Sequence, residues 1–493
     1  MKTLVVVDRP ENWPLEIPGV EVVAALEYLT ADRFGGSGLR VLNLCRSYRY
    51  QTLGYYVSLL ALSRGHRPLP SVTTIQDLRT WSIVRVLSEE LEELIQKSLE
   101  PLQSDEFELS IYFGENMAKR YRRLARRLYE LFPAPLLRAR FRRRHAEWEM
   151  VGLRLIGTKD VPEGHRPFVI EAASRHVRRR DRPPNRPVGR YDLAILVEDG
   201  EEEPPSDERA IKKLVKAGEA VGFEVDLISP DDYGRVGEYD ALFLRMTTGV
   251  EHVTYRFARR AKAEGLVVID EPDAILRCMN KVFLHELLSR HKVPTPKTRV
   301  VHRDNLERIS GELGFPCILK RPDSAFSQGV KRADDLEAFR KLAAEYLETS
   351  ELLIAQEFLP TEFDWRIGVL GGRALYACRY YMAKGHWQII QHQGKSTRYG
   401  KVDTVPLGGA PSDVVALAVR AANLIGDGLF GVDLKEGPSG PMVIEVNDNP
   451  SLESGYEDAI LGDELYEAVM RWFLDRLDRL RGTNRNEARN GAA

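Results

Sequence analysis

The chain has 493 residues, of which 43% are hydrophobic and 29% are charged, and its formal net charge is −2. This length predicts two to four domains, and the balanced charge points to no particular class of partner. No run of about 18 apolar residues occurs, so no membrane-spanning helix is expected.

Cysteine usage and the first residues bear on the compartment. The four cysteines lie far apart and form no CxxC pair: Cys45, Cys278, Cys317 and Cys378. This pattern favours structural thiols in a reducing cytoplasm over disulfides or zinc ligands. The apolar run Leu4–Val7 is too short for the core of a signal peptide and is expected to be a first strand.

Residues 1–174 are expected to form an α/β domain. Strand-like runs alternate with helical spacing of apolar residues. The strands are predicted at Leu4–Val7, Arg40–Cys45 and Phe107–Phe113, and the helices at Gln51–Ser63 and Val84–Leu99. The domain is followed by residues 175–190, where seven arginines and three prolines predict a linker or an exposed arm.

A strongly basic segment lies inside this domain. Lys119–Arg144 holds eleven Lys or Arg residues and one acid, Glu130. Nucleic-acid binding is one interpretation. However, Tyr121, Leu124 and Leu128 repeat at helical spacing, which favours a cationic helix that faces solvent or another domain.

Residues 191–276 predict a small, largely parallel sheet, because short strands alternate with helices. The strands are expected at Leu193–Val197, Phe223–Ile228, Ala241–Leu244 and Leu266–Ile269, with helices capped by Ser206 and spanning His252–Glu264. The turn after the first strand is acidic and lacks GxGxxG, so dinucleotide binding is not expected.

Two positions in these domains are candidates for ligand contact. Arg46–Tyr56 packs arginines and tyrosines between a strand and a helix start, where ligands often bind, although structural packing is the simpler interpretation. Arg245 and His252 follow a strand of the parallel sheet at its carboxyl end, which is the usual binding side.

Residues 277–482 predict a mixed domain, and residues 483–493 a disordered tail. Helices are expected at Met279–His291, Asp334–Leu347 and Asp413–Ile425, and strands at Cys317–Lys320, Leu352–Phe358, Trp365–Leu370 and Ala374–Arg379.

A hairpin near the end of this domain carries the strongest chemical signal. Its arms, Phe430–Leu434 and Met442–Val446, flank a Gly/Pro/Ser turn that sets Asp433 opposite Glu445, with Asn447 on the same face. Two neighbouring carboxylates favour a bound cation, and oxygen ligands alone suit Mg²⁺. The alternative is an ordinary hairpin with solvated acids, but the direct continuation into Asn449-Pro450 favours the metal.

Two lysines and one strand end add to this signal. Lys320 ends an apolar strand before a small loop, Ser324–Gly329, and Lys281 begins a helix. Such lysines hold phosphate by point charge, although a solvated lysine is the commoner case. At Gln356-Glu357 a buried strand ends where backbone groups could pair with an adenine edge.

In this order along the chain, the motifs resemble the ATP-grasp superfamily, and within it the RimK-like carboxylate–amine ligases. The resemblance covers roughly residues 190–480, and residues 1–174 look like the extra N-terminal domain of one RimK-like subgroup. It implies an α/β and α+β multidomain chain. A pre-ATP-grasp domain at 191–276 precedes an ATP-grasp domain at 277–482, whose two lobes divide near residue 357.

The resemblance also assigns residues. It makes Lys281 and Lys320 phosphate contacts, closes the loop of Ser324, Ser327 and Gly329 over the γ-phosphate, presents the backbone of Glu357 and Phe358 to adenine, and sets Asp364 at the ribose. Asp433, Glu445 and Asn447 would hold Mg²⁺, with Mn²⁺ as a substitute. In this family a carboxylate attacks ATP to give an acyl phosphate, which an amine captures.

Two departures from the family pattern stand out. The phosphate loop has few glycines, and the family's Arg-x-Asn falls on Trp387–Ile390, which contains no arginine. The charge at that corner is therefore expected from other cations. Arg379 and Lys384 are the first candidates, followed by Lys395 and Arg398.

The function expected from the sequence is an ATP- and Mg²⁺-dependent ligase in the cytoplasm that joins a carboxylate to an amine. The acceptor is a small molecule, an amino acid, a peptide or a protein C-terminus. Nucleic acid and membrane are not expected as partners, and a homo-oligomer is left open. The alternatives are an ATP-grasp kinase acting on a hydroxyl, or a nucleotide-sensing protein that binds RNA or protein.

Overall fold

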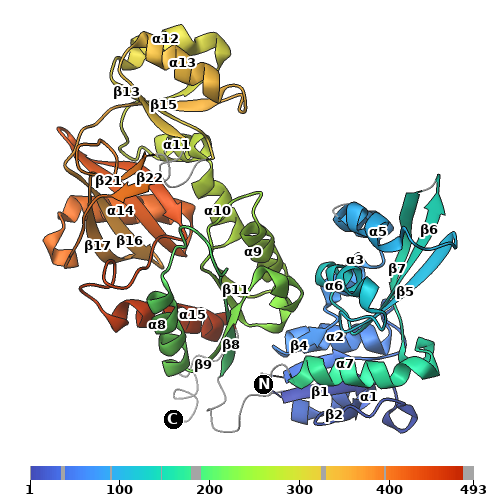
Figure 1. The fold of residues 1–493 in the computed structure, drawn as a ribbon. Coiled ribbons are helices and arrows are strands. Elements are labelled where there is room, and N and C mark those ends of the chain that lie inside the picture. The colour runs from blue at the N-terminus through green and yellow to red at the C-terminus, as the bar shows by residue number, and fades with distance from the viewer. Residues whose placement is uncertain are drawn as a thin grey trace, which may run out of the picture.

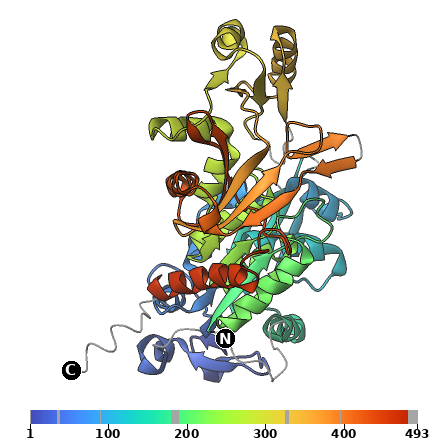
Figure 2. The same cartoon turned by 90° about the vertical axis from the view of Figure 1, so that its left-hand side faces the viewer.

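The computed structural model describes residues 2–34, 39–88, 91–145, 147–178, 190–323, 329–393 and 396–480. Figure 1 shows the N-terminal part, in blue and teal, beside the rest of the chain. Its parallel sheet and the lobe built around β13 and β15 lie at opposite ends of the molecule in both views (Figures 1 and 2). The mixed α/β and α+β class expected from the sequence is confirmed.

A parallel four-stranded sheet of order β2-β1-β3-β4 opens the chain. Its strands are β1 (Lys2–Val7), β2 (Glu21–Ala24), β3 (Leu39–Asn43) and β4 (Arg67–Leu69), and its flanking helices include α1 (Ala25–Thr30), α2 (Leu53–Ser63) and α7 (Arg166–Arg178). Alternation along β1 sends Leu4 and Val6 into one buried cluster and Val5 and Val7 into another, so both faces of the sheet are covered.

An antiparallel sheet of order β5-β6-β7 completes the N-terminal part. It contains β5 (Glu106–Tyr112), β6 (Leu136–Arg144) and β7 (Glu147–Leu155), and lies near α3 (Val72–Asp77), α4 (Trp81–Ser88), α5 (Glu92–Leu99) and α6 (Arg122–Leu131). Leu109, Phe141 and Leu128 share its buried core.

Three predictions for the N-terminal part need correction. Val84–Leu99 is two helices, α4 and α5, and not one. In the basic segment only the first half is helical, because Pro133 and Pro135 end the helix and β6 follows. The region predicted as a linker from residue 175 begins inside α7, which continues to Arg178 because Val169, Ala172 and Ala173 on its inner side are buried.

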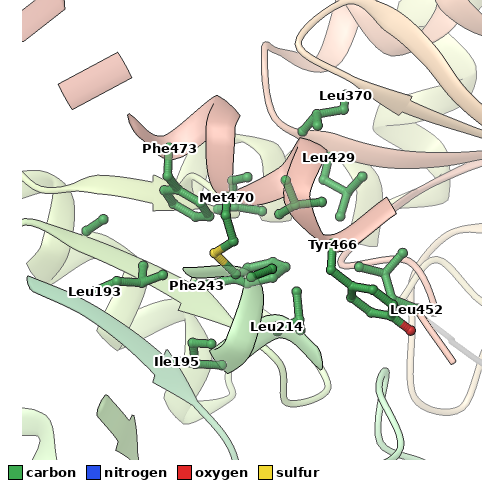
Figure 3. Packing of buried hydrophobic residues seen from close by; sticks show 14 of the residues in the cluster. Leu193, Ile195, Leu214, Phe243, Leu370, Leu429, Leu452, Tyr466, Met470 and Phe473 are labelled. Carbon is green, nitrogen blue, oxygen red and sulfur yellow. The ribbon is translucent and has the colours of Figure 1, made fainter. Parts of the chain in front are cut away.

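A second parallel sheet, of order β11-β10-β8-β9, forms the middle of the chain. Its strands are β8 (Tyr191–Leu196), β9 (Phe223–Ile228), β10 (Ala241–Leu244) and β11 (Val267–Ile269), and its helices are α8 (Glu208–Ala220), α9 (Val253–Ala263) and α10 (Pro272–Met279). The C-terminal helix α15 (Asp463–Leu480) returns to this sheet, where Met470 and Phe473 pack near Phe243 and Leu193 (Figure 3). The cap of α8 is Asp207, which accepts from the Ala210 N–H, and not Ser206.

Two lobes follow the central sheet. The first has a sheet of order β12-β15-β13-β14, and the second a five-stranded antiparallel sheet of order β20-β17-β16-β21-β22. The first contains α11 (Lys281–Arg290), β12 (Thr298–Val301), α12 (Leu306–Leu313), β13 (Cys317–Lys320), β14 (Val330–Ala333), α13 (Leu336–Tyr346) and β15 (Leu353–Glu357). The second contains β16 (Phe363–Leu370), β17 (Arg373–Tyr381), β20 (Val402–Val405), α14 (Ser412–Ile425), β21 (Leu429–Gly437) and β22 (Gly440–Asp448), with a separate ribbon of β18 (Ile390–Gln393) and β19 (Ser396–Tyr399).

Within the described ranges, no helix combines the length and the apolar character needed to cross a membrane.

The N-terminal and central sheets meet at their amino ends. Arg67, at the start of β4, donates to Asp240, just before β10, at 2.9 Å, and Asp240 also accepts from the backbone N–H of Asp192 at 2.8 Å. Arg40 reaches the Asp192 carboxylate at 3.2 Å. Asp240 is fully buried. The carboxyl ends of the central strands are therefore left to face the two lobes.

We predict that Asp240→Ala lowers the free energy of unfolding by about 3–5 kcal/mol, because it leaves the buried Arg67 guanidinium without its carboxylate. Urea denaturation measures this change. The matched control is Glu106→Ala, since Glu106 pairs with Arg142 in an exposed salt bridge and its loss should change stability by less than about 1 kcal/mol. If the two substitutions lowered the free energy of unfolding equally, the buried Arg67–Asp240 pair would not have the larger effect on stability that we predict.

Candidate functional site

The five-stranded sheet has one apolar face, and its opposite face, here called the polar face, carries polar residues beside an apolar part that includes Leu370, Tyr376 and Leu429. Successive side chains on a strand point to opposite sides, so Trp365, Ile367 and Val432 pack against α14 in a buried core. Arg366 and Asp433, each next to one of these residues, lie on the other face. The polar face is the floor of the candidate site.

The hairpin of β21 and β22 has the predicted geometry. Asp433 pairs directly with Glu445, and Asn447 lies opposite Gly431. The amide of Asn447 donates to Asp433 at 3.1 Å, and the Lys281 ammonium contacts Glu445 at 2.9 Å. Arg366 donates to both carboxylate oxygens of Asp433, one of them at 2.8 Å.

The donor set fits a hard divalent cation. Two half-buried carboxylates and one amide lie on a single face, and each carboxylate is held by a basic side chain of the protein, Asp433 by Arg366 and Glu445 by Lys281. Positive charge is thus already required at this corner. Oxygen donors in this number suit Mg²⁺ or Mn²⁺ with water and phosphate as further ligands.

A cavity of about 170 Å³ lies between the two lobes beside this corner. Its lining combines residues from β13, β15, β16, β21 and β22 with the start of α11. The predicted site residues among them are Lys281, Lys320, Glu357, Phe358, Asp364, Asp433, Glu445 and Asn447. Lys281 and Asn447, which are 166 residues apart in the sequence, therefore share one cavity.

Lys320 is the most perturbed basic group in the cavity. It is 8% exposed, and burial lowers its pKa to about 8, against the opposing effect of Glu445 and with a further lowering by Lys281. An ammonium held at this cost is stabilised by an incoming polyanion. Lys281 and Lys320 in turn lower the pKa of Glu445, although burial acts to raise it.

Asp364 is paired more tightly than the sequence indicates. Lys435, on β21, donates to its carboxylate at 2.5 Å and to the Thr361 hydroxyl at 2.6 Å, and Thr361 donates to Asp364 at 3.0 Å. Burial nevertheless raises the pKa of Asp364, since desolvation outweighs the attraction of Lys435. Sequence reasoning missed both Lys435 and the role of Arg366, although each lies two residues from a predicted ligand along its strand.

Glu357 and Phe358 lie at the cavity, but one backbone donor predicted for adenine is already engaged. The Glu357 N–H donates to the Lys297 carbonyl at 2.9 Å, and the Glu357 carboxylate accepts from the Lys297 N–H. The Phe358 ring meets Trp387 edge to face at 5.9 Å. Trp387 and Gln388 thus form the wall where the family pattern has its arginine.

The structure contradicts the prediction that Arg379 contacts reacting groups. Arg379 pairs with Trp365 across β16 and β17, on the apolar face, and its guanidinium lies 5.0 Å from the Trp365 ring centroid. Lys384 is exposed and does not line the cavity, although the neighbouring Met382 does.

Part of the predicted site lies outside the described residues. Ser324, Ser327 and Lys395 fall in this class, as does the side chain of Arg398. Gly329 is described and has a φ of 72°, a conformation that glycine adopts without strain. Its carbonyl accepts from the Arg321 N–H at 2.9 Å, which fixes the end of the loop next to Lys320.

Arg245 is structural, contrary to the substrate role considered for it. Arg245 is 1% exposed and donates to Asn449 at 2.6 Å, to Ser206 at 2.8 Å and to the Pro450 carbonyl at 3.0 Å. It thereby fixes the chain just after Asn447 to the central sheet. His252 caps α9 through the Thr254 N–H.

The chain is similar in sequence to proteins of a known family. Residues 25–172 match the model of the RimK-like ATP-grasp N-terminal domain, and residues 278–466 match that of the RimK-like ATP-grasp domain. Together the two segments span more than half of the chain. A probable alpha-L-glutamate ligase of Vibrio vulnificus is 27% identical over 266 residues, which cover 50% of this chain and 85% of that protein. One of Rhodopirellula baltica is 28% identical over 263 residues, covering 52% and 62%.

Solved structures with a similar arrangement include a RimK-domain ATP-grasp protein of Sphaerobacter thermophilus, with 17% identity, a TM-score of 0.44 and coverage of 57% of this chain and 98% of that one. The D-alanine–D-alanine ligase of Bacillus anthracis complexed with ATP has 14% identity, a TM-score of 0.47 and coverage of 59% and 98%. By its two domain matches, the chain is an ATP-grasp protein. It belongs to the RimK-like family and is an ADP-forming ligase of C–N bonds.

We predict that ATP affinity falls as the pH rises through the pKa of Lys320. Below about pH 8 the ammonium is charged before ATP arrives, whereas above it a proton must be taken up on binding. The dissociation constant for ATP should rise roughly tenfold between about pH 7 and pH 9, as calorimetric titration can measure.

Lys320→Arg is the matched control, since its guanidinium stays charged throughout this range. Its affinity for ATP should be independent of pH. A pH dependence that persists in this variant would assign the titration to another group.

Proposed function

We propose that this protein activates a carboxylate with ATP and transfers it to an amine, forming an amide, ADP and phosphate. The observation that carries the proposal is the convergence of Lys281, Lys320 and the Asp433/Glu445/Asn447 corner on one cavity between two lobes. This combination of cations and oxygen ligands suits a triphosphate and its metal ion.

The chemistry is divided between two steps. A carboxylate oxygen of the substrate attacks the γ-phosphorus of ATP, the bond between this phosphorus and the β–γ bridging oxygen breaks, and ADP leaves. The amine nitrogen then attacks the acyl carbon of the acyl phosphate, phosphate departs and the nitrogen loses a proton. Lys281 and Lys320 would neutralise phosphate oxygens in both steps.

Asp433, Glu445 and Asn447 would hold Mg²⁺, which neutralises developing charge on the phosphate oxygens. The side chain of Lys281 would remain beside Glu445 at the start of α11 and orient the same phosphates. Asp364 would face the nucleotide sugar, and Phe358 with Trp387 would form the apolar wall near its base. Tight lobes around the cavity would exclude water that could hydrolyse the acyl phosphate.

Glutamate is the amino acid that we propose first as a substrate. The relatives described above carry the name alpha-L-glutamate ligase, and Arg366 on the polar face suits an acidic molecule. The acceptor is proposed to be an amino acid, a peptide or a protein C-terminus. Four buried free cysteines support action in a reducing compartment such as the cytoplasm.

We propose that the N-terminal part of the chain takes no direct part in catalysis. Its basic helix α6 supports this interpretation, because Arg126 and Arg127 pair with Glu130 and Arg126 also donates to the Asp231 carbonyl of the central domain. These contacts favour interdomain packing over nucleic-acid binding.

We predict that the protein, given ATP, Mg²⁺, hydroxylamine and L-glutamate or another amino acid, releases ADP and forms a hydroxamate. Hydroxylamine intercepts an acyl phosphate, and the ferric complex of the product can be measured by its colour. With ¹⁸O in the substrate carboxylate, one labelled oxygen should appear in the phosphate released.

Glu445→Gln is the control, since it removes one charge of the proposed metal corner at nearly constant volume, and it should form neither product while keeping its circular dichroism spectrum. ADP release with a stable phosphorylated product, and without hydroxamate, would instead assign the chain to the kinases.

A further inference from the structure

Arg366 occupies the position next to the proposed metal ligands. It lies on β16 directly across from Asp433 on β21. Its Nε and Nη2 donate to the two oxygens of the Asp433 carboxylate, the latter at 2.8 Å. Both side chains are nearly buried, at 15% and 14% exposure. This fork-to-fork pairing is the strongest arrangement that an arginine and a carboxylate adopt.

The surrounding residues keep room for Arg366. A Cβ atom on Gly431 would lie 2.8 Å from the Pro450 Cβ and 3.0 Å from the Arg366 Cδ, so a larger residue here would crowd both side chains. The guanidinium lies 5.1 Å from the centroid of the Tyr380 ring. The Tyr380 hydroxyl in turn donates to Glu457, which follows the metal-bearing strand in the chain.

A guanidinium and a divalent cation compete for the same carboxylate. Arg366 uses both oxygens of Asp433, and Asn447 donates to one of them as well. Two cations a few ångströms apart in a half-buried site repel each other strongly. Since Arg366 stays charged at every accessible pH, it cannot relieve this repulsion by losing a proton, whereas moving away from Asp433 would relieve it.

The present contact of the guanidinium with the Tyr380 ring suggests how Arg366 would leave Asp433: rotation about the side-chain bonds would keep the guanidinium beside Tyr380 and turn its two-pronged edge away from Asp433. That edge is suited to a planar carboxylate. The cavity wall at Trp387 and Gln388 provides no arginine, so Arg366 is the nearest guanidinium to the proposed metal corner among the residues that line or touch it.

We propose that Arg366 is a metal-released latch: it holds Asp433 in the metal-free enzyme, leaves when a divalent cation binds, and then holds the carboxylate that is to be phosphorylated. This inference rests on the proposed function for its second step. The first step concerns metal binding alone. The latch makes the carboxylate contact available only after the metal corner is filled, which protects ATP from reaction in an incomplete complex.

The test of the first step is Mn²⁺ binding in the absence of nucleotide, measured by the electron paramagnetic resonance signal of free Mn²⁺. Arg366→Gln should bind Mn²⁺ about tenfold more tightly than the wild type or better, because Asp433 loses its competing cation. Unchanged or weaker binding would overturn the latch. Arg366→Lys, which keeps the charge but loses the fork, should lie between the two.

Arg379→Gln is the matched control for loss of an arginine stacked on an aromatic ring in the same sheet. Since Arg379 lies on the apolar face, this variant should bind Mn²⁺ as the wild type does. A gain in Mn²⁺ affinity as large as that of Arg366→Gln would show that the effect is general and would overturn the proposal.

The second step is tested in the hydroxamate assay, with the carboxylate that the wild type uses. Arg366→Lys should raise the KM for that carboxylate by about thirtyfold while the KM for ATP changes by less than about threefold. A large rise in the KM for ATP with little change in the KM for the carboxylate would show that Arg366 contacts the nucleotide and would overturn this step. The Mn²⁺ measurement needs no turnover, so failure of the latch and failure of the ligase proposal give different results.

Discussion

The opposed carboxylates of Asp433 and Glu445 are the constraint on which the site depends. Two acids on one half-buried face of a sheet repel each other and lose hydration, and such a pair persists only where positive charge compensates it. The protein provides that charge from two directions, through Arg366 on the neighbouring strand and Lys281 at the start of α11. Lys281 also lines the cavity between the two lobes.

The rest of the fold keeps this corner in place. Arg245 reaches from the central sheet to Asn449 and Pro450, immediately after the last proposed metal ligand. The C-terminal helix α15 packs on that same sheet, and Leu452, shortly after β22, belongs to the same buried cluster. The N-terminal part attaches at the opposite, amino ends of the central strands, through Arg67 and Asp240. Its docking therefore leaves the cavity accessible.

The features of the site that depend on local periodicity could be predicted from the sequence. The register of Asp433 with Glu445 follows from a tight turn and a period of two, and it could be predicted within one hairpin. The choice between Arg366 and Arg379 could not, because it depends on which face of β16 and β17 meets α14, a long-range contact. The same phase that buries Trp365 sets Arg379 beside it and turns Arg366 toward Asp433. The contact of Lys435 with Asp364 could not be predicted either, because it depends on the pairing of β21 with β16, which are distant in the sequence.

The most direct test of the account is the position of a metal ion in crystals grown with ADP and Mn²⁺, located by anomalous scattering. We expect a peak at about 2.0–2.3 Å from oxygens of Asp433, Glu445 and Asn447, with the Arg366 guanidinium moved off Asp433 and the phosphates of ADP between Lys281 and Lys320. A peak elsewhere, or Mn²⁺ bound to phosphates alone while Arg366 still holds Asp433, would contradict it.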